Sequence, residues 1–537
     1  MTNISIMVPV LFAVLALFMF YTSGAIMMEL LKFKMKNHFA TIAAGFFVYF
    51  TFISIFTLPL QLISVLPYFF FVYYLWGITI VYLLFCCVFA KYWLSTTFIS
   101  ISSLIYLVVA LIFLIMNYVV YKFISDGSFS RHKNTISIMF WLKDNPVSFF
   151  NASSMYNVLG FKPFQGWYTF QLSIVMLAGA QSFQYQDVII PFIFIIDSFV
   201  AASIFVYMYD SFRKVENTWA KYTLLFLSLI TFVGTKVILQ DFNYSLWTGD
   251  IFFIYLIMYS IIIILRYTSQ GFRERNDPTF VGLVIGGYIA FSWDSAYQVL
   301  FLLYGLLFVI QRRYTINFTK DILKMSLFAL VDLFFFNIIL KFYLQTILFG
   351  ALLLFLIIVA YLMTRSYSVV IKFETFVDQR INFVTLLLPM AFMIISLGLT
   401  LASNESFVNP EDTYLNFLYV WTAVFRNELS RYWITFMLSM AILAISFVWI
   451  FIRNRFQTNV LTGIVDLLLI SYLTFYNPIV VKFINIIYPM MTQSNGIIMI
   501  IQGTLAINVL LYWGFNKINY KKTEKVKVYR KPSILIV

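Results

Sequence analysis

The stretch VIIPFIFIIDSFVAASIFVYM, residues 188–208, decides the fold class of this chain. A helix needs about 20 predominantly apolar residues to cross the hydrocarbon core of a bilayer, and this stretch is long enough. Similar runs recur through all 537 residues, of which 62% are hydrophobic and only 11% charged. The mean hydropathy of +0.91 excludes an ordinary soluble globular core. The sequence therefore predicts an all-α, polytopic integral membrane protein.

Hydropathy read over a window of about 19 residues predicts about fifteen transmembrane helices. The first is read as a retained span because it lacks the basic flank and cleavage site of a signal peptide. The predicted spans are residues 5–21, 39–60, 68–90, 99–121, 188–208, 222–239, 251–266, 280–292, 296–310, 322–340, 346–363, 382–402, 432–452, 459–476 and 496–514.

Lysine and arginine set the predicted orientation, since basic loops near spans stay in the cytoplasm. With the N-terminus outside, the basic clusters at 32–36, 213–221, 266–275, 312–320, 453–455 and 517–531 all fall on the cytoplasmic face. The net charge of +14 is thus a topology signal, and no nucleic-acid partner is predicted. The C-terminus is cytoplasmic, and the basic tail 517–537 is expected to contact anionic lipids. The composition is typical of a low-GC bacterium, so the predicted location is the bacterial cytoplasmic membrane.

The largest predicted outer loop, residues 123–166, is followed by an apolar stretch too short to cross the bilayer. Residues 167–180, and also 415–425 and 477–489, are therefore placed as interfacial half-helices on the outer face. The predicted organisation is an N-terminal four-helix membrane segment (1–121), an outer loop with its half-helix (122–187), a transmembrane core (188–516) and the tail (517–537).

Three aspartates, Asp197, Asp332 and Asp466, lie near the middle of predicted spans. An ionised carboxylate there costs about 2.5 to 3.5 kcal/mol on insertion scales, so each should face protein or water. Each is either a proton relay or cavity-lining group, or a neutral or hydrogen-bonded structural contact. Asp294, in a corner between two short predicted helices, either points into an outer cavity or caps the helix that follows.

Two stretches carry a family resemblance. They are PFQGWYTFQLSIVMLAGAQSFQYQDVIIPFIFIIDSFVAASIFVYMYDSFRKV (163–215) and FVGLVIGGYIAFSWDSAYQVLFLLYGLLFVIQRR (280–313). The first resembles the first-loop region of GT-C membrane glycosyltransferases, and the second resembles a pair of short helices typical of that superfamily. The whole chain is similar to an uncharacterised bacterial family of polytopic GT-C-like membrane proteins, through TSGAIMMELLKFK (22–34), LRYTSQGFRE (265–274) and YNPIVVKFINIIYP (476–489).

The resemblance implies that Asp126, early in the outer loop, lies where a polyprenyl-phosphate-linked sugar donor meets its acceptor. A carboxylate there would act as the base that deprotonates the acceptor hydroxyl. Arg131, Lys133 and Lys143 would hold the departing phosphate. Apart from the resemblance, Trp167 is a candidate ring for sugar stacking because it lies near a predicted outer corner, and Asp294 is a candidate for the same cavity unless it caps the following helix.

The chain departs from the family where many relatives carry paired acids, because Asp126 stands between Ser125 and Gly127. No cofactor is expected, and a divalent metal is not favoured. The leading hypothesis is a glycosyltransferase that modifies a cell-envelope glycan or lipid on the outer face. The alternatives are a transporter or flippase of a lipid-linked saccharide, and a non-catalytic subunit that works with other proteins of polysaccharide synthesis. The chain shows no internal repeat, which counts against the transporter.

Overall fold

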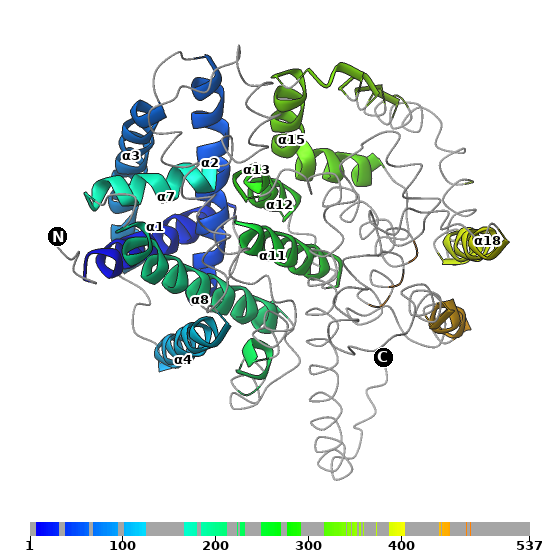
Figure 1. Ribbon diagram of the computed structural model, residues 1–537, viewed down its shortest axis with the longest axis horizontal. Helices are drawn as coiled ribbons and strands as arrows, with labels where there is room; N and C mark the ends of the chain where they lie inside the picture. Colours follow the sequence, from blue (N-terminus) through cyan, green and yellow to red (C-terminus); the bar gives the residue numbers. More distant parts are fainter. Residues whose placement is uncertain are drawn as a thin grey trace, which may run out of the picture.

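The described residues of the computed structural model of this chain are almost all helical. It describes residues 7–31, 38–63, 68–94, 101–124, 166–179, 184–211, 226–230, 249–269, 277–291, 316–339, 341–344, 386–402 and 440–451 except 442, with shorter pieces and single positions between 223 and 473. These residues contain helices and no strand, so the predicted all-α class is confirmed for them. Figure 1 shows α1 (Met7–Leu30), η1 (His38–Ala40), α2 (Thr41–Ile63), α3 (Tyr68–Leu94), α4 (Ile101–Ile124), α7 (Gly166–Leu177), α8 (Tyr185–Ser211), α11 (Asp250–Ser269), α12 (Asp277–Ile285), α13 (Tyr288–Phe291), α15 (Ile316–Ile339) and α18 (Leu388–Ala402).

Two helices in the described part are long and apolar enough to cross a membrane. They are α1 and the Asp187–Met208 portion of α8. Shorter apolar helical stretches occur within α2, α3, α4, α11 and the α12–α13 pair. The predicted total of about fifteen spans stays a prediction.

The α1 helix extends further than hydropathy indicated. The predicted first span ends at residue 21, but α1 continues to Leu30. The added turns contain Thr22, Ser23 and Gly24, which lower the hydropathy and yet are buried against α2. A β-carbon on Gly24 would lie 2.0 Å from the carbonyl oxygen of Thr41, so the two backbones approach closely at this crossing.

The predicted span 280–292 is wrong as a continuous helix. It is broken into α12 and α13 by a turn at Gly286 and Gly287. The Gly287 amide donates to the carbonyl of Val284, three residues back, and leaves the carbonyl of Leu283 without its usual helical donor. The hydroxyl of Thr51, on α2, donates to that Leu283 oxygen at 2.5 Å. A side chain of a neighbouring helix thus supplies the hydrogen bond that the break removes from the Leu283 carbonyl.

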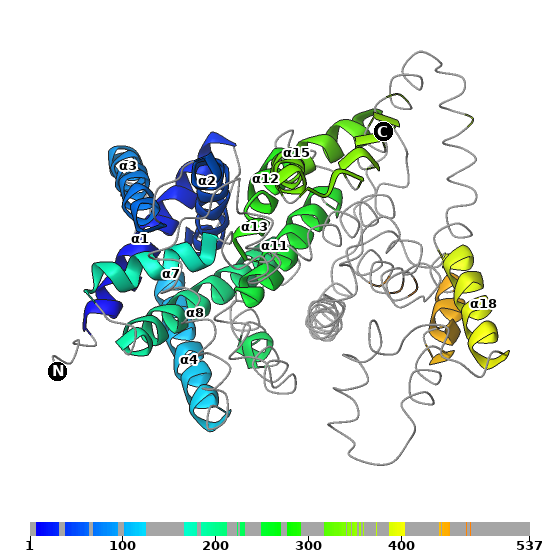
Figure 2. The same ribbon diagram turned by 45° about the horizontal axis from the view of Figure 1, so that its top comes forward.

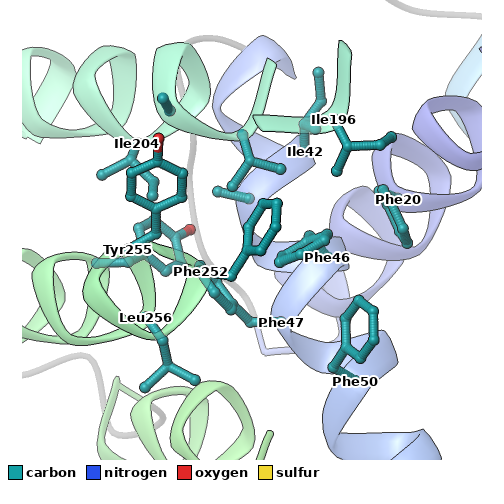
Figure 3. Packing of buried hydrophobic residues seen from close by; sticks show 14 of the residues in the cluster. Phe20, Ile42, Phe46, Phe47, Phe50, Ile196, Ile204, Phe252, Tyr255 and Leu256 are labelled. Atoms are coloured by element: carbon teal, nitrogen blue, oxygen red, sulfur yellow. The ribbon is translucent and has the colours of Figure 1, made fainter. Parts of the chain in front are cut away.

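An aromatic core joins α2, α7, α11 and α13. Phe46 of α2 faces Phe252 of α11, with ring centroids 5.1 Å apart (Figure 3). Phe50 of α2 lies 4.7 Å from Phe291 of α13 and 5.7 Å from Trp167 of α7. These contacts hold α7 and the end of α13 against one side of α2.

Neighbouring helices have defined relative directions. α1 and α2 are antiparallel, because Gly24 lies beside Thr41 while Phe20 packs against Tyr49. α11 and α12–α13 are also antiparallel, since Tyr259 contacts Phe280 and Phe252 contacts Phe291.

Two other pairs run in the same direction. In α12 and α15, Gly282 lies beside Lys324 and Gly286 lies beside Phe328. In α8 and α11, Asp197 contacts Tyr255 and, further along both helices, Tyr207 contacts Tyr259.

A smaller apolar cluster involves α18. Leu386, Met390 and Met393 are buried together with Leu443, Leu469 and Leu473. Figure 2 shows α18 beside the helical residues 440–451, drawn in orange. This pairing accounts for the described part of the predicted spans 382–402 and 432–452.

Candidate functional site

The carboxylate of Asp197 lies at a junction of three helices. Asp197 is in the middle of α8 and is fully buried. Its Oδ1 accepts a hydrogen bond from the phenol of Tyr255, on α11, at 2.5 Å. Its Oδ2 accepts one from Nδ2 of Asn117, on α4, at 3.0 Å. The two carboxyl oxygens of Asp197 therefore link α8 to α4 and to α11 by hydrogen bonds in an otherwise apolar environment.

Asn117 completes this polar cluster. It is fully buried, and its Nδ2 donates a second hydrogen bond to Oγ of Ser198 at 3.2 Å. Both amide hydrogens are thereby used. Its Oδ1 has no hydrogen-bond donor among the described residues. The four side chains that form the Asp197 cluster are Asn117, Asp197, Ser198 and Tyr255.

Asp332 is the second predicted intramembrane acid that the structure describes. It is 5% exposed in α15. In the described ranges no donor reaches its Oδ2, so it differs from Asp197, whose two oxygens are both engaged. Asp197 and Asp332 belong to different helices, α8 and α15. The third predicted acid, Asp466, lies outside the described residues.

Trp167 begins the short helix α7, which has 12 residues, in agreement with the prediction of a helix too short to cross a bilayer. Its side chain is fully buried. The ring packs 4.5 Å from Phe252 and closes on Gly249, where a β-carbon would lie 3.0 Å from Cδ1 of Trp167. A sugar could stack on this ring only after those neighbours move.

Three segment ends meet around the start of α7. A β-carbon on Gly166 would contact the Ala290 β-carbon at 3.4 Å, near the end of α13. Trp167 contacts Gly249, at the start of α11, and Phe291, the last residue of α13, at a centroid distance of 6.1 Å. Gly249 has a positive φ of 89°, which favours glycine at this tight entry to α11. The start of α7, the start of α11 and the end of α13 therefore converge.

The remaining predicted site residues lie outside the described residues. They are Asp126, Arg131, Lys133, Lys143 and Asp294. The structure describes their attachment points: α4 ends at Ile124, two residues before Asp126, and α13 ends at Phe291, three residues before Asp294.

Three polar residues that hydropathy and motifs do not single out join helices in the structure. Asn117 and Tyr255 hold Asp197, and Ser203 of α8 accepts from the Ala43 amide and donates to the Phe39 carbonyl, both at 3.0 Å. Ser203 thus caps the N-terminus of α2 from another helix. The available signal was a polar side chain within an apolar run, as at Asn117 in LIMNYVV.

Comparisons with protein families, curated proteins and solved structures find no match to this chain. Within the part of the chain that the structure describes, no group of three or more histidine, cysteine, aspartate or glutamate side chains could hold a metal ion. The function is accordingly argued from the residues and their arrangement.

Proposed function

We propose that this chain is a multi-pass protein of the bacterial cytoplasmic membrane. The observation that carries the proposal is the exposed face of α4, opposite its buried face, where large apolar side chains occur at helical spacing. They are Leu104, Leu107, Val108, Leu111, Ile115 and Val119. A soluble helix would place polar residues on this face, whereas hydrocarbon tails favour apolar ones.

Other helices support the same proposal. On α3, Ile80, Val81, Leu84 and Val88 are exposed, and on α1, Leu11, Val14 and Leu15 are exposed. The helix directions also agree with a chain that crosses the bilayer repeatedly. Consecutive predicted spans α1 and α2 are antiparallel, as are α11 and α12–α13, whereas α8 and α11, with one predicted span between them, run in the same direction.

The test of membrane insertion is extraction of the full chain from cells that express it. We expect the protein to stay in the membrane pellet after a wash with alkaline carbonate and to enter solution only with detergent. Leu111→Lys should reduce the inserted fraction, because lysine near a helix centre costs about 2.5 to 3.5 kcal/mol. Leu111→Met is the matched control and should insert normally. A wild-type chain that is soluble without detergent would refute the proposal.

Within this membrane protein, we propose a GT-C-like glycosyltransferase that takes a sugar from a polyprenyl-phosphate donor on the outer face. The resemblance across 163–215 and 280–313 supports this, together with the convergence of Gly166, Gly249 and Phe291. All three positions belong to the face predicted to be extracytoplasmic. The start of α7, which follows the predicted loop of Asp126 in sequence, thus lies beside the end of α13, three residues before Asp294.

The chemistry follows from the residue types. The acceptor hydroxyl attacks C1 of the sugar, its proton passes to the Asp126 carboxylate, and the bond from C1 to the phosphate oxygen breaks. Arg131 and Lys133 stabilise the charge that appears on the phosphate, with Lys143 in the same segment. The prenyl tail lies in the hydrocarbon region beneath α7. The acceptor is a lipid or a glycan of the cell envelope.

The test is Asp126→Asn in proteoliposomes supplied with radiolabelled polyprenyl-phosphate hexoses or pentoses and a membrane-lipid acceptor fraction. We expect the rate of sugar transfer to fall by about 10²- to 10⁴-fold, the usual contribution of a general base. Asp187→Asn is the matched control, because Asp187 is an exposed acid in the first turn of α8 and on the same predicted face. Equal rates in the two variants would refute the role of Asp126.

A second candidate is a transporter or flippase of a lipid-linked saccharide. Two observations favour it: the buried acids Asp197 and Asp332, and the helix broken at Gly286 and Gly287. It predicts that a pH gradient drives a fluorescent polyprenyl-linked sugar across proteoliposomes without chemical change, and that Asp332→Asn abolishes this movement. Transfer without movement would reject the transporter.

A non-catalytic subunit gives a third pattern of results. Neither transfer nor movement would be seen with the wild-type chain. Cells with Asp126→Asn would keep their envelope polysaccharide, and cells without residues 125–165 would lose it.

A further inference from the structure

The α4 helix has a buried face on which Asn117 is the one amide side chain among the described residues. Tyr106, Val109, Ala110, Phe113 and Asn117 are buried, at the spacing of a single helical face. Asn117 is nearest to the C-terminal end, about two turns before Ile124. The opposite face carries the exposed apolar residues described above. The aliphatic side chains on the two faces of α4 would tolerate a small rotation or slide in an apolar environment.

The contacts of Asn117 do not tolerate such movement. Its Nδ2 is 3.0 Å from Asp197 Oδ2 and 3.2 Å from Ser198 Oγ, so both hydrogens have acceptors on α8. Asp197 is held in turn by Tyr255 of α11. A slip of one residue along α4 would shift its side chains by about 1.5 Å and turn them by about 100°, which would break both bonds.

The physical reason is the difference between apolar and polar packing in a membrane. Lipid tails are as apolar as leucine, so apolar helix faces alone specify register weakly, whereas a buried hydrogen bond requires one rotation and one height. A single buried asparagine fixes the register of a coiled coil in the same way.

We propose that Asn117 is a positioning residue, which fixes the rotation and height of α4 and thereby the position of its C-terminal end, Ile124. As far as it concerns Asp126, the inference rests on the proposed function, because Asp126 follows α4 by two residues. Asn117 itself is too deep in the described packing to touch a substrate on the outer face.

The experiment compares Asn117→Leu with the wild-type chain, both full length in lipid nanodiscs. Hydrogen exchange of residues 118–135 is measured, together with kcat and KM for sugar transfer. We expect faster exchange in that segment and a fall in kcat of about 10²-fold at nearly unchanged KM, because misplacement of a reacting group by about 1 Å has such an effect. Tyr49→Phe is the matched control. It removes a buried side-chain hydrogen bond of 2.6 Å to Thr79, between α2 and α3.

A second variant keeps the inference testable if Asn117→Leu does not fold. The exchanged pair Asn117→Asp with Asp197→Asn retains one amide and one carboxylate, and it should restore wild-type exchange in residues 118–135. The inference would be overturned if residues 118–135 exchanged faster in the exchanged pair than in the wild-type chain. It would also be overturned if they exchanged equally fast in Asn117→Leu and Tyr49→Phe. If Asp126→Asn keeps full activity, the proposed function fails, and the exchange measurements still decide the role of Asn117.

Discussion

The crossing of α1 and α2 and the contact of α4 with α8 hold helices together in different ways. At the first, Gly24 and Gly45 allow the two backbones to meet directly: a β-carbon on Gly45 would lie only 1.7 Å from the carbonyl oxygen of Phe20. At the second, the helices are joined by side chains, with Asn117 donating to Asp197. The first contact depends on the absence of side chains and the second on two particular ones.

This difference indicates how each contact responds to change. Close approach of two helix backbones gains dispersion energy over a wide area. One added methyl group at the contact pushes the backbones apart, and much of that energy is lost at once. A hydrogen-bonded contact loses only its own bonds when one partner is removed, and the surrounding apolar faces still pack. The α1–α2 crossing is therefore expected to be the more sensitive of the two.

The largest effect is expected at Gly45. Gly45→Ala should lower the free energy of unfolding by at least about 3 kcal/mol, since the new methyl group overlaps the backbone of α1. The measurement is thermal or denaturant unfolding of the purified chain in detergent, followed by near-UV signals of its aromatic residues.

Gly77→Ala in α3 is the matched control, because a β-carbon there meets no atom within 4 Å. It should leave stability unchanged or raise it by about 0.5 to 1 kcal/mol, as alanine favours a helix more than glycine does. Equal effects of the two substitutions would contradict the close-approach account of the crossing.

A smaller loss is expected at the hydrogen-bonded contact. Asp197→Ala removes the acceptor of both Asn117 and Tyr255, and the free energy of unfolding should fall by about 2 kcal/mol. The same unfolding assay measures it. A double-mutant cycle with Asn117→Ala should show coupling between the two positions. Strictly additive losses would mean that the α4–α8 contact does not depend on this hydrogen bond.

The smallest of these losses is expected at Ser203, which joins α8 to the start of α2. Ser203→Ala should cost about 1 kcal/mol, the usual contribution of a helix cap. Ser54→Ala is the control, because Ser54 donates only to the carbonyl of Phe50 within its own helix, at 2.8 Å. We expect hydrogen exchange at the first turn of α2 to rise in the Ser203 variant alone. Faster exchange of this turn in both variants would contradict the role of Ser203 as the cap of α2.

Most described helices could be predicted from the sequence, and their boundaries less so. The span predicted at 188–208 lies within α8 (Tyr185–Ser211), and the span predicted from residue 68 begins where α3 begins. Long apolar runs determine such helices because unpaired backbone groups are costly away from water. The break at Gly286 and Gly287 was missed, since the apolar residues around two glycines keep the mean hydropathy of the window high whether or not the helix continues.

Single residues of the candidate site could be predicted from the sequence, but the contacts between them could not. Asp197 was identified because a carboxylate in an apolar run must find polar partners. Its partners were not identified, because Asn117 and Tyr255 are 80 and 58 residues away along the chain. Trp167 was expected to be a sugar platform, but its depth of burial depends on Phe50, Phe252 and Gly249, from other helices.

The sequence by itself determined the helical class, the positions of the described apolar helices and the presence of an acid within two of them. These follow from hydropathy and length, which are local properties of the chain. Only the tertiary structure decided that Thr51 satisfies the broken α12–α13 helix, that Ser203 caps α2, and that Asn117 meets Asp197. Polar groups buried among apolar helices bond to whichever partner the packing brings within about 3 Å, and that partner belongs to a distant part of the chain.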